Sequence, residues 1–298
     1  MTEPQTTGSP TVPVCYRHPG RETYVRCVRC NRPICPDCMN AASVGFQCPE
    51  CVSEGKRTVR KPQGAFGGNH RSGDRGYVTI GLIAVNVLVY VLTLVGGGLG
   101  AAMGKGSSFL AGSTTSLELK LGVFAPAIAD GQYYRLVTAM FVHFSILHVA
   151  MNMYVLWVLG RYLERALGPA RFTALYFIAG IGGNVACYLF SGNTLSGGAS
   201  TAVFGLFAAM FFINRKLGLS SSSVVVLIVI NLVFTFLVPG ISILGHVGGL
   251  VTGGVLGLGI AYAPRSARTP VQLAVFGGVL LILILLTVAR TAQLLGGF

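Results

Sequence analysis

The chain has 298 residues, of which 52% are hydrophobic and only 10% are charged. Soluble domains carry about 25% charged residues, so the composition excludes an ordinary soluble protein and indicates one that crosses a membrane several times. The net charge of +13 could suggest binding to nucleic acid, but the distribution of the charges along the chain argues against it. Of the 22 Lys and Arg residues, 11 lie in residues 1–76, before the first apolar run, and the others lie between apolar segments or near their ends.

The N-terminal quarter of the chain divides by composition into three parts. Residues 1–14 are polar and rich in Pro and Thr, which predicts a disordered tail. Residues 15–52 hold seven of the eight cysteines and form a candidate metal-binding module. Residues 53–76 are basic and contain several glycines, which is typical of a linker.

The candidate module contains four ligand pairs, and two residues separate the members of every pair. The pairs are Cys15 and His18, Cys27 and Cys30, Cys35 and Cys38, and Cys48 and Cys51. Eight soft ligands can fill two tetrahedral zinc sites, whereas disulfides explain the pattern poorly because the cytoplasm is reducing. Interleaved and sequential pairing both remain open. Since protein ligands would fill every position, we expect both zinc ions to be structural and to supply the folding energy of a small module.

Several arginines lie among these ligands, and their positive charge could bind anionic lipid or nucleic acid. We interpret them as a solvated face and expect a cytoplasmic protein as the partner. The arginines are Arg17, Arg21, Arg26, Arg29 and Arg32.

Seven apolar segments follow, and about 20 apolar residues are needed to cross a bilayer. The fourth and fifth are short for this purpose. The segments are residues 78–97, 144–163, 171–191, 199–214, 223–239, 243–262 and 271–289. Residues 98–135 are too long and too polar for a turn, so we expect a structured loop. The fold class is therefore an all-α polytopic membrane protein with a small N-terminal zinc-binding domain.

The charges predict the orientation, because cytoplasmic loops of membrane proteins carry an excess of Lys and Arg. If the N-terminus is cytoplasmic, 18 of the 22 cations lie inside and only Lys105, Lys120, Arg135 and Arg290 lie outside. We therefore expect an integral multi-pass protein of a bacterial cell membrane, with a cytoplasmic N-terminus and an outer C-terminus.

Four polar residues in these segments suggest a reaction. Ser200 begins the fourth segment and His246 lies near the start of the sixth, and both are predicted near the outer ends. A histidine inside hydrocarbon is costly and marks a candidate functional site. His148 and Asn152 share one helical face of the second segment. Each residue alone fits a cap or an interhelical hydrogen bond, but the four together favour a nucleophile, a base and an oxyanion site.

A third, acidic member is not expected beside this pair. No Asp or Glu follows Glu164 in the chain, so a third member would have to be Glu118, Asp130 or Glu164. Glu164 is predicted at the cytoplasmic side, and the other two lie in the outer loop. The sequence therefore favours a Ser–His dyad, with His246 as the base and with the Ser200 N–H, His148 and Asn152 stabilising the oxyanion.

Taken together, these motifs resemble the rhomboid family of intramembrane serine proteases over residues 77–262. The family motifs are HxxxN on the second core helix, GxSG at the start of the fourth and HxxGxxxG on the sixth. They correspond here to His148 and Asn152, to Gly198-Ala199-Ser200-Thr201, and to His246, Gly249 and Gly253. Tyr134-Arg135 stands where the family usually has Trp-Arg, and Glu164 matches a glutamate that closes the second helix.

The resemblance implies Ser200 as nucleophile, His246 as general base, and His148 and Asn152 in the oxyanion hole, with no cofactor for catalysis. Gly198, Gly249, Gly253 and Phe204 are expected to support the site, and Phe204 replaces a tyrosine that often stacks beneath the histidine. Thr201 replaces a glycine, and we expect its branched side chain to crowd the oxyanion region.

The resemblance also implies an architecture and an activity. Residues 77–262 would form a six-helix core, and residues 263–298 an extra C-terminal helix and tail. Residues 15–52 resemble a B-box-type zinc finger. The expected activity is cleavage of transmembrane segments of other membrane proteins near the outer face, with membrane lipid as surroundings. The alternative is an inactive rhomboid-like protein that binds membrane clients and recruits partners through its zinc finger.

Overall fold

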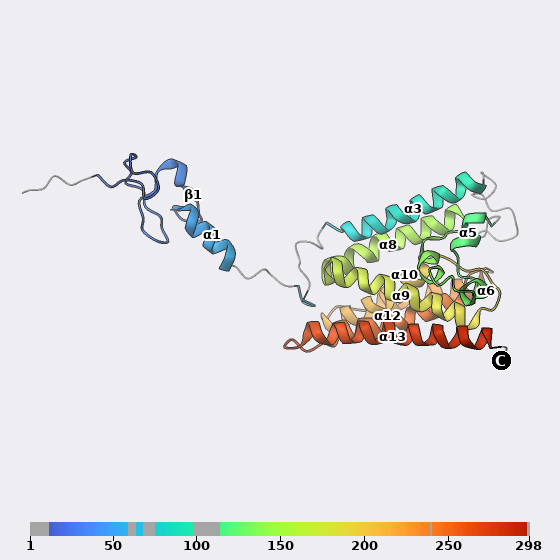
Figure 1. Cartoon of the computed structure of the whole chain (residues 1–298). Coiled ribbons are helices and arrows are strands. Elements are labelled where there is room, and N and C mark those ends of the chain that lie inside the picture. The colour runs from blue at the N-terminus through green and yellow to red at the C-terminus, as the bar shows by residue number, and fades with distance from the viewer. Residues whose placement is uncertain (1–11, 59–63, 68–74, 98–113, 239, 297–298) are drawn as a thin grey trace, which may run out of the picture. The chain divides into compact units, whose positions relative to one another are not determined.

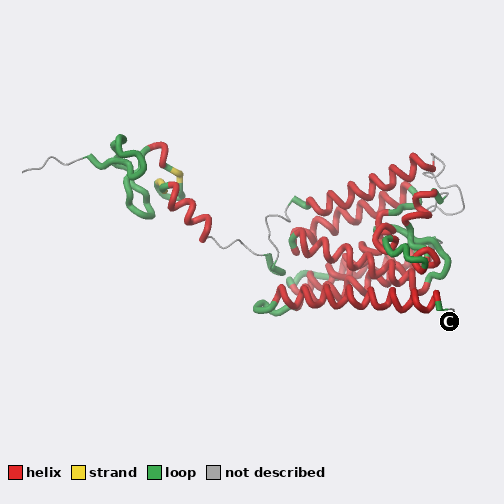
Figure 2. The backbone as a smooth tube through the Cα atoms, in the orientation of Figure 1, coloured by secondary structure: helices red, strands yellow, loops and turns green. Residues whose placement is uncertain are grey.

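The computed structural model describes residues 12–58, 64–67, 75–97, 114–238 and 240–296, and the chain divides into two units, residues 1–61 and 62–298 (Figure 1). The first unit is mostly loop, whereas the second is almost entirely helical (Figure 2). The predicted tail lies largely outside the described residues. Its last residue, Val14, forms a β-bridge with Glu22 and so belongs to the first unit.

The first unit holds few regular elements. These are the 3-10 helix η1 (Pro36–Cys38), the antiparallel strands β1 (Asn40–Ala41) and β2 (Phe46–Gln47), and the helix α1 (Pro49–Thr58). Six cysteines and Ile34 make up the buried cluster around which the loops fold. A module with so little apolar core depends on its ligand groups for stability.

The structure differs from the predicted linker, residues 53–76, at both ends. Helix α1 continues to Thr58, since no proline interrupts it after Pro49 at its first position. Phe66 is buried in the second unit, and its carbonyl accepts a hydrogen bond from Gln272 Nε2 at 3.3 Å. Residues 59–63 and 68–74 lie outside the described part of the chain.

Seven long helices form the second unit and correspond to the seven predicted apolar segments. They are α3 (Tyr77–Gly97), α8 (Ile146–Leu167), α9 (Pro169–Phe190), α10 (Ser200–Lys216), α11 (Ser222–Leu237), α12 (Ile243–Tyr262) and α13 (Arg268–Leu295). Five helices of the described residues, α3, α8, α9, α12 and α13, are long and apolar enough to cross a membrane. The predicted all-α polytopic fold is confirmed.

The predicted structured loop is observed where it is described. Residues 98–113 lie outside the described residues, and the remainder contains α5 (Ser116–Leu121) and α6 (Ala125–Ala129). The short helices α7 (Arg135–Thr138) and η2, a 3-10 helix (Ala139–Phe141), follow at its end. Arg135 is buried and donates from Nη1 to the carbonyls of Leu119 and Gly122, at 2.6 and 2.9 Å. These hydrogen bonds link α7 to the C-terminal end of α5.

Helix α10 lies at the centre of the second unit. It packs against α8, α9 and α12, and every residue from Thr201 to Ala209 is buried. A helix of 17 residues is about 26 Å long at 1.5 Å per residue. Its first residue, Ser200, is partly buried.

Glycines bring α12 against α10. A Cβ added to Gly249 would overlap the carbonyl of Thr201, and one added to Gly253 would overlap the backbone of Gly205. The two helices therefore touch backbone to backbone, as small residues allow. This contact fixes the distance between the helix that carries Ser200 and the helix that carries His246.

Candidate active site and candidate metal centres

Ser200 is the first residue of α10 and follows a backbone turn that only glycine tolerates well. Gly198 has φ +143°, and its N–H donates to the carbonyl of Ala139 at 2.8 Å. A Cβ on Gly198 would lie 2.9 Å from His148 Nε2 and 3.3 Å from Ser200 Oγ. Both the conformation and the close approach therefore require glycine here.

His246 lies directly opposite Ser200. Its Nε2 is 2.8 Å from Ser200 Oγ, which is a normal hydrogen-bond length for a nucleophile and its base. The ring is 7% exposed and stacks on Phe204, with 4.1 Å between ring centroids and 17° between the planes. The phenylalanine thus supports the imidazole from below without a hydroxyl.

The second ring nitrogen of His246 contacts a residue that sequence reasoning missed. Nδ1 is 2.7 Å from Oγ1 of Thr235, which lies on α11 and is 2% exposed. The available signal was weak: Thr235 and Asn231 are two polar residues in an otherwise apolar segment, and such residues commonly link membrane helices.

His148 and Asn152 lie on the α8 face that borders the same space. The Phe144 N–H approaches His148 Nδ1 at 3.5 Å, and His148 Nε2 is the ring nitrogen that lies beside Gly198. Asn152 Nδ2 donates to the carbonyl of His148 at 2.9 Å and retains a second N–H. The point beside Gly198, about 3 Å from both His148 Nε2 and Ser200 Oγ, is where a reacting oxygen could meet nucleophile and donor together.

These residues line one cavity of about 120 Å³ between α8, α10, α11 and α12. Ser200, His246, His148 and Asn152 all lie on its wall, together with Phe204 and Thr235. The cavity is large enough for several water molecules. The structure therefore brings together the four residues that the sequence singled out.

Thr201 also lies on the wall of this cavity. Its side chain lies against Gly183 of α9 and Gly245 of α12, where added Cβ atoms would come within 3.0 Å of its methyl carbon. Its hydroxyl is 3.4 Å from the Gly198 carbonyl. The branched side chain fills space that these two glycines leave between three helices.

Glu164 lies outside the cavity and serves the fold. Its carboxylate accepts hydrogen bonds from the backbone N–H of Val78, from the N–H of Thr79 and from the Thr79 hydroxyl, at 2.8 to 3.0 Å. These donors belong to the first turn of α3, whose N–H groups have no partner within the helix. The carboxylate thus caps α3, and the expectation that it is no part of the site agrees with this placement.

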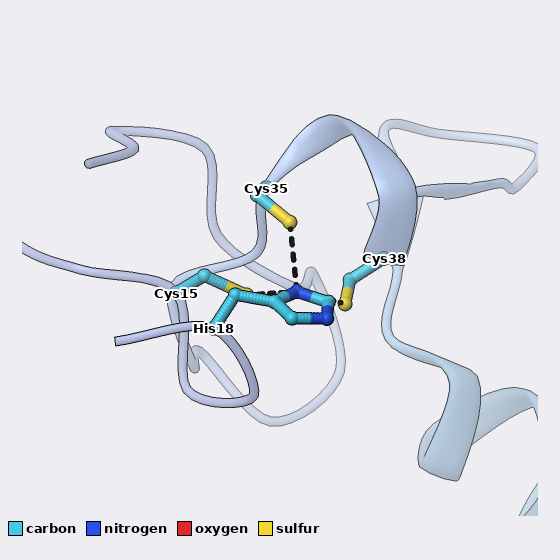
Figure 3. Close-up of side chains that lie close together, drawn as sticks. All are labelled: Cys15, His18, Cys35 and Cys38. Carbon is cyan, nitrogen blue, oxygen red and sulfur yellow. Dashed lines mark hydrogen bonds between the residues drawn. The ribbon is translucent and has the colours of Figure 1, made fainter. Parts of the chain in front are cut away.

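Two separate groups of ligand atoms occur in the first unit. Cys15, His18, Cys35 and Cys38 form one, and Cys27, Cys30, Cys48 and Cys51 form the other, with all ligand atoms of a group within 4.8 Å of one another. In the first group the three sulfur atoms lie 3.2 to 3.8 Å from His18 Nδ1 (Figure 3). In a tetrahedral site with metal–ligand bonds of about 2.3 Å, the ligand atoms lie about 3.8 Å apart. The observed separations are close to this value, so each group could hold one metal ion. The grouping is the interleaved one.

Arg32 adds a positive charge at the second group. Its Nε donates to Cys30 Sγ at 3.2 Å, and Nη2 is 3.7 Å from Cys48 Sγ. The guanidinium also lies 4.4 Å from the centre of the Tyr16 ring. The hydrogen bond from Arg32 lowers the pKa of the Cys30 thiol, which favours the thiolate that metal binding needs.

The sequence of the chain is similar to those of known proteins. A profile of the rhomboid domain matches residues 130–263, which include the whole cavity wall described above. The chain is 41% identical to rhomboid protease GluP of Bacillus subtilis over 131 residues. These aligned residues make up 42% of this chain and 26% of GluP. Over 135 residues it is 31% identical to putative rhomboid protease YdcA of the same organism, covering 43% of this chain and 68% of YdcA.

A plant protein is similar as well. RHOMBOID-like protein 6, mitochondrial, of Arabidopsis thaliana is 35% identical over 167 residues, which are 53% of this chain and 54% of the plant protein. The chain therefore spans about a quarter of GluP and about half of the plant relative.

Proposed function

The chain belongs to the rhomboid family, and from that premise we propose that it is an intramembrane serine endopeptidase that cleaves transmembrane segments of other membrane proteins. It is an integral multi-pass membrane protein, and the observation that carries the proposal is the Ser200–His246 hydrogen bond of 2.8 Å on the wall of the cavity. A serine hydroxyl paired with a buried imidazole is the arrangement that acyl transfer requires.

In the first half of the reaction, Ser200 Oγ attacks the scissile carbonyl carbon and its proton passes to His246 Nε2. The carbonyl oxygen becomes an oxyanion beside Gly198, within reach of His148 Nε2–H, the free Asn152 N–H and the Ser200 backbone N–H. Such donors are often the largest catalytic contribution. The C–N bond then breaks, the leaving amine takes the proton from His246, and an acyl ester on Ser200 remains.

In the second half, water attacks the ester carbonyl and gives a proton to His246 Nε2. The same donors hold the second oxyanion. Its collapse breaks the bond to Ser200 Oγ, which recovers the proton from His246 as the acid product leaves. The described residues on the cavity wall include no carboxylate, so this scheme uses His246 alone as base and acid.

We place the site toward the outer face and the first unit in the cytoplasm. Arg161 and Arg165 lie near the end of α8, and Arg215 and Lys216 end α10, whereas Ser200 begins α10. The cations therefore gather at the end of the bundle away from Ser200, as the positive-inside rule expects of the cytoplasmic end. A bacterial cell membrane, as the sequence suggests, stays a prediction.

For the first unit we propose two structural zinc ions in a B-box-type finger. Soft thiolate and imidazole ligands in groups of four match the preference of zinc, and a site closed by protein ligands leaves no position for catalysis. Such an ion would supply folding energy to the loops around it. The cytoplasmic protein partner of this finger remains an expectation.

The test is cleavage of a model transmembrane substrate by the purified full chain in proteoliposomes. We expect cleavage by the wild type and none by Ser200→Ala or His246→Ala. Ser220→Ala, which removes an exposed hydroxyl beyond the other end of α10, is the matched control and should cleave normally. A wild-type protein that binds the substrate without cleaving it, and that a fluorophosphonate does not label, would instead support the inactive, client-binding alternative.

A further inference from the structure

The proposed base has a partner on each ring nitrogen. Ser200 Oγ lies 2.8 Å from Nε2 of His246, and Thr235 Oγ1 lies 2.7 Å from Nδ1. Thr235 is 2% exposed, so water does not replace this contact. The two bonds hold the imidazole between α10 and α11.

The second contact of Thr235 decides the direction of its bond to the histidine. Its hydroxyl donates to the backbone carbonyl of Asn231, one turn earlier on α11, at 2.7 Å. A hydroxyl has one hydrogen and two lone pairs. With its hydrogen given to Asn231, Thr235 accepts from His246, and the ring proton is on Nδ1.

The tautomer matters because a base must offer a lone pair to the nucleophile. With the proton on Nδ1, the lone pair of Nε2 faces Ser200 Oγ. The opposite tautomer would present an N–H to Ser200 and could not take its proton. In serine hydrolases with an acidic third member, a carboxylate fixes this tautomer.

The described carboxylates of the second unit, Glu118, Asp130 and Glu164, do not line the cavity, and Asp130 is exposed. Glu164 caps α3, and Glu118 forms a capping box with Thr115 at the start of α5. A neutral hydroxyl also suits this place, because a buried carboxylate would carry a desolvation cost that a hydroxyl does not.

The same bond ties α11 to the site. Thr235 and Val224 are the two buried residues of α11, and its remaining described side chains are partly or fully exposed. The helix therefore has little other packing that would align it with His246. The Thr235–His246 hydrogen bond therefore both aligns α11 with α12 and selects the tautomer of His246.

Resting on the proposed protease function, we propose that Thr235 is a positioning residue that holds His246 in the Nδ1–H tautomer, in the place that an acidic residue takes in a triad. It touches neither substrate nor the reacting atoms and acts through the imidazole.

Three variants of the full chain test this. Thr235→Val keeps the shape and removes the hydroxyl, and Thr235→Ser keeps the hydroxyl. Thr287→Val is the control, since Thr287 is also buried and donates to the carbonyl four residues earlier, Leu283, at 2.8 Å, but lies on α13. Losing one such hydrogen bond costs about tenfold in rate.

We therefore expect kcat for Thr235→Val to fall about tenfold with KM unchanged, and Thr235→Ser and Thr287→Val to stay near the wild type. Fluorophosphonate labelling should slow by the same factor, because Ser200 Oγ forms its bond to phosphorus, fluoride leaves, and the proton goes to His246. Equal kcat for Thr235→Val and Thr287→Val, or a drop confined to KM, would overturn the proposal.

A readout without catalysis separates this proposal from the proposed function. In protein labelled with ¹⁵N-histidine, at a pH where imidazole is neutral, the His246 signals are identified by their loss in His246→Ala. The wild type should show protonated Nδ1 and unprotonated Nε2, and Thr235→Val should lose this preference. The opposite tautomer in the wild type refutes the role of Thr235 even if cleavage is observed, whereas a wild type with the expected tautomer and no cleavage refutes the protease function alone.

Discussion

Gly249→Ala should strongly reduce activity through a single methyl group added where α12 contacts α10. The three atoms nearest to an added Cβ are backbone atoms of Thr201, with the carbonyl carbon at 2.9 Å and Cα at 3.3 Å. Carbon atoms pack best about 3.5–4.0 Å apart, and a backbone cannot rotate away as a side chain can. Helix α12 must therefore move by about 1 Å from α10.

That displacement acts on the dyad, because α10 carries Ser200 and α12 carries His246. A bond of 2.8 Å lengthened by about 1 Å is no longer a hydrogen bond. A misplacement of this size costs about 100-fold in rate, and overpacking costs about 1–3 kcal/mol of stability. We expect kcat/KM to fall about 100-fold, while the melting temperature falls only modestly.

The matched control is Gly254→Ala on the same helix. A Cβ there would meet only Ala208 Cβ and a Phe212 ring carbon, both at 3.7 Å, which is ordinary contact. Cleavage and fluorophosphonate labelling of both variants should be measured beside thermal unfolding in the same detergent. If Gly249→Ala is as active as Gly254→Ala, helix spacing does not set the Ser200–His246 distance, and the reasoning fails.

Three further predictions concern the fold and the metal centres. Glu164→Gln should lower the free energy of unfolding by about 1–3 kcal/mol, because the carboxylate holds the first turn of α3, including Thr79; unchanged thermal unfolding would contradict the cap. Arg32→Ala should weaken metal binding at one of the two sites about 10–100-fold, as measured by competition with a chelator. Arg17→Ala, which changes an exposed arginine, is the control. Equal metal affinities of the two variants would count against a role for the Arg32 guanidinium. Cys15→Ser with Cys35→Ser should lose one of two bound zinc ions by elemental analysis, because both belong to one interleaved group; loss of both ions would favour sequential pairing.

The sequence predicts the helices well because hydrophobicity and length determine them locally. Each of the seven apolar segments is a helix, and the largest change is α13, which runs from Arg268 to Leu295 where residues 271–289 were predicted. Ser200, His246, His148 and Asn152 could also be chosen, since polar groups stand out in apolar segments. Their meeting on one cavity wall depends on how helices pack, which no local pattern contains.

Other features depend on partners distant in the sequence. The four ligand pairs have identical spacing, so only the folded loops of the first unit distinguish interleaved from sequential groups. Thr201 is similar: a comparison at one position predicts crowding of the oxyanion region, whereas only the structure shows that its methyl group contacts Gly183 and Gly245. A substitution is therefore judged by the residues across the helix interface and not by its own position.

Thr235 shows most clearly why the site needs the structure. From the sequence, the absence of acids after Glu164 favours a dyad, and the reasoning ends there. The fold places a hydroxyl at the nitrogen where a triad has its carboxylate, at 2.7 Å. In an apolar interior this substitution is physically sensible, since orienting an imidazole requires an acceptor but not a charge. The cost is a weaker hold on the imidazolium formed during the reaction, because a neutral acceptor stabilises positive charge less than a carboxylate does. The oxyanion donors on α8 and at the start of α10 must then contribute a larger share of the transition-state stabilisation, which makes the spacing of α8, α10 and α12 more decisive than the identity of a third residue.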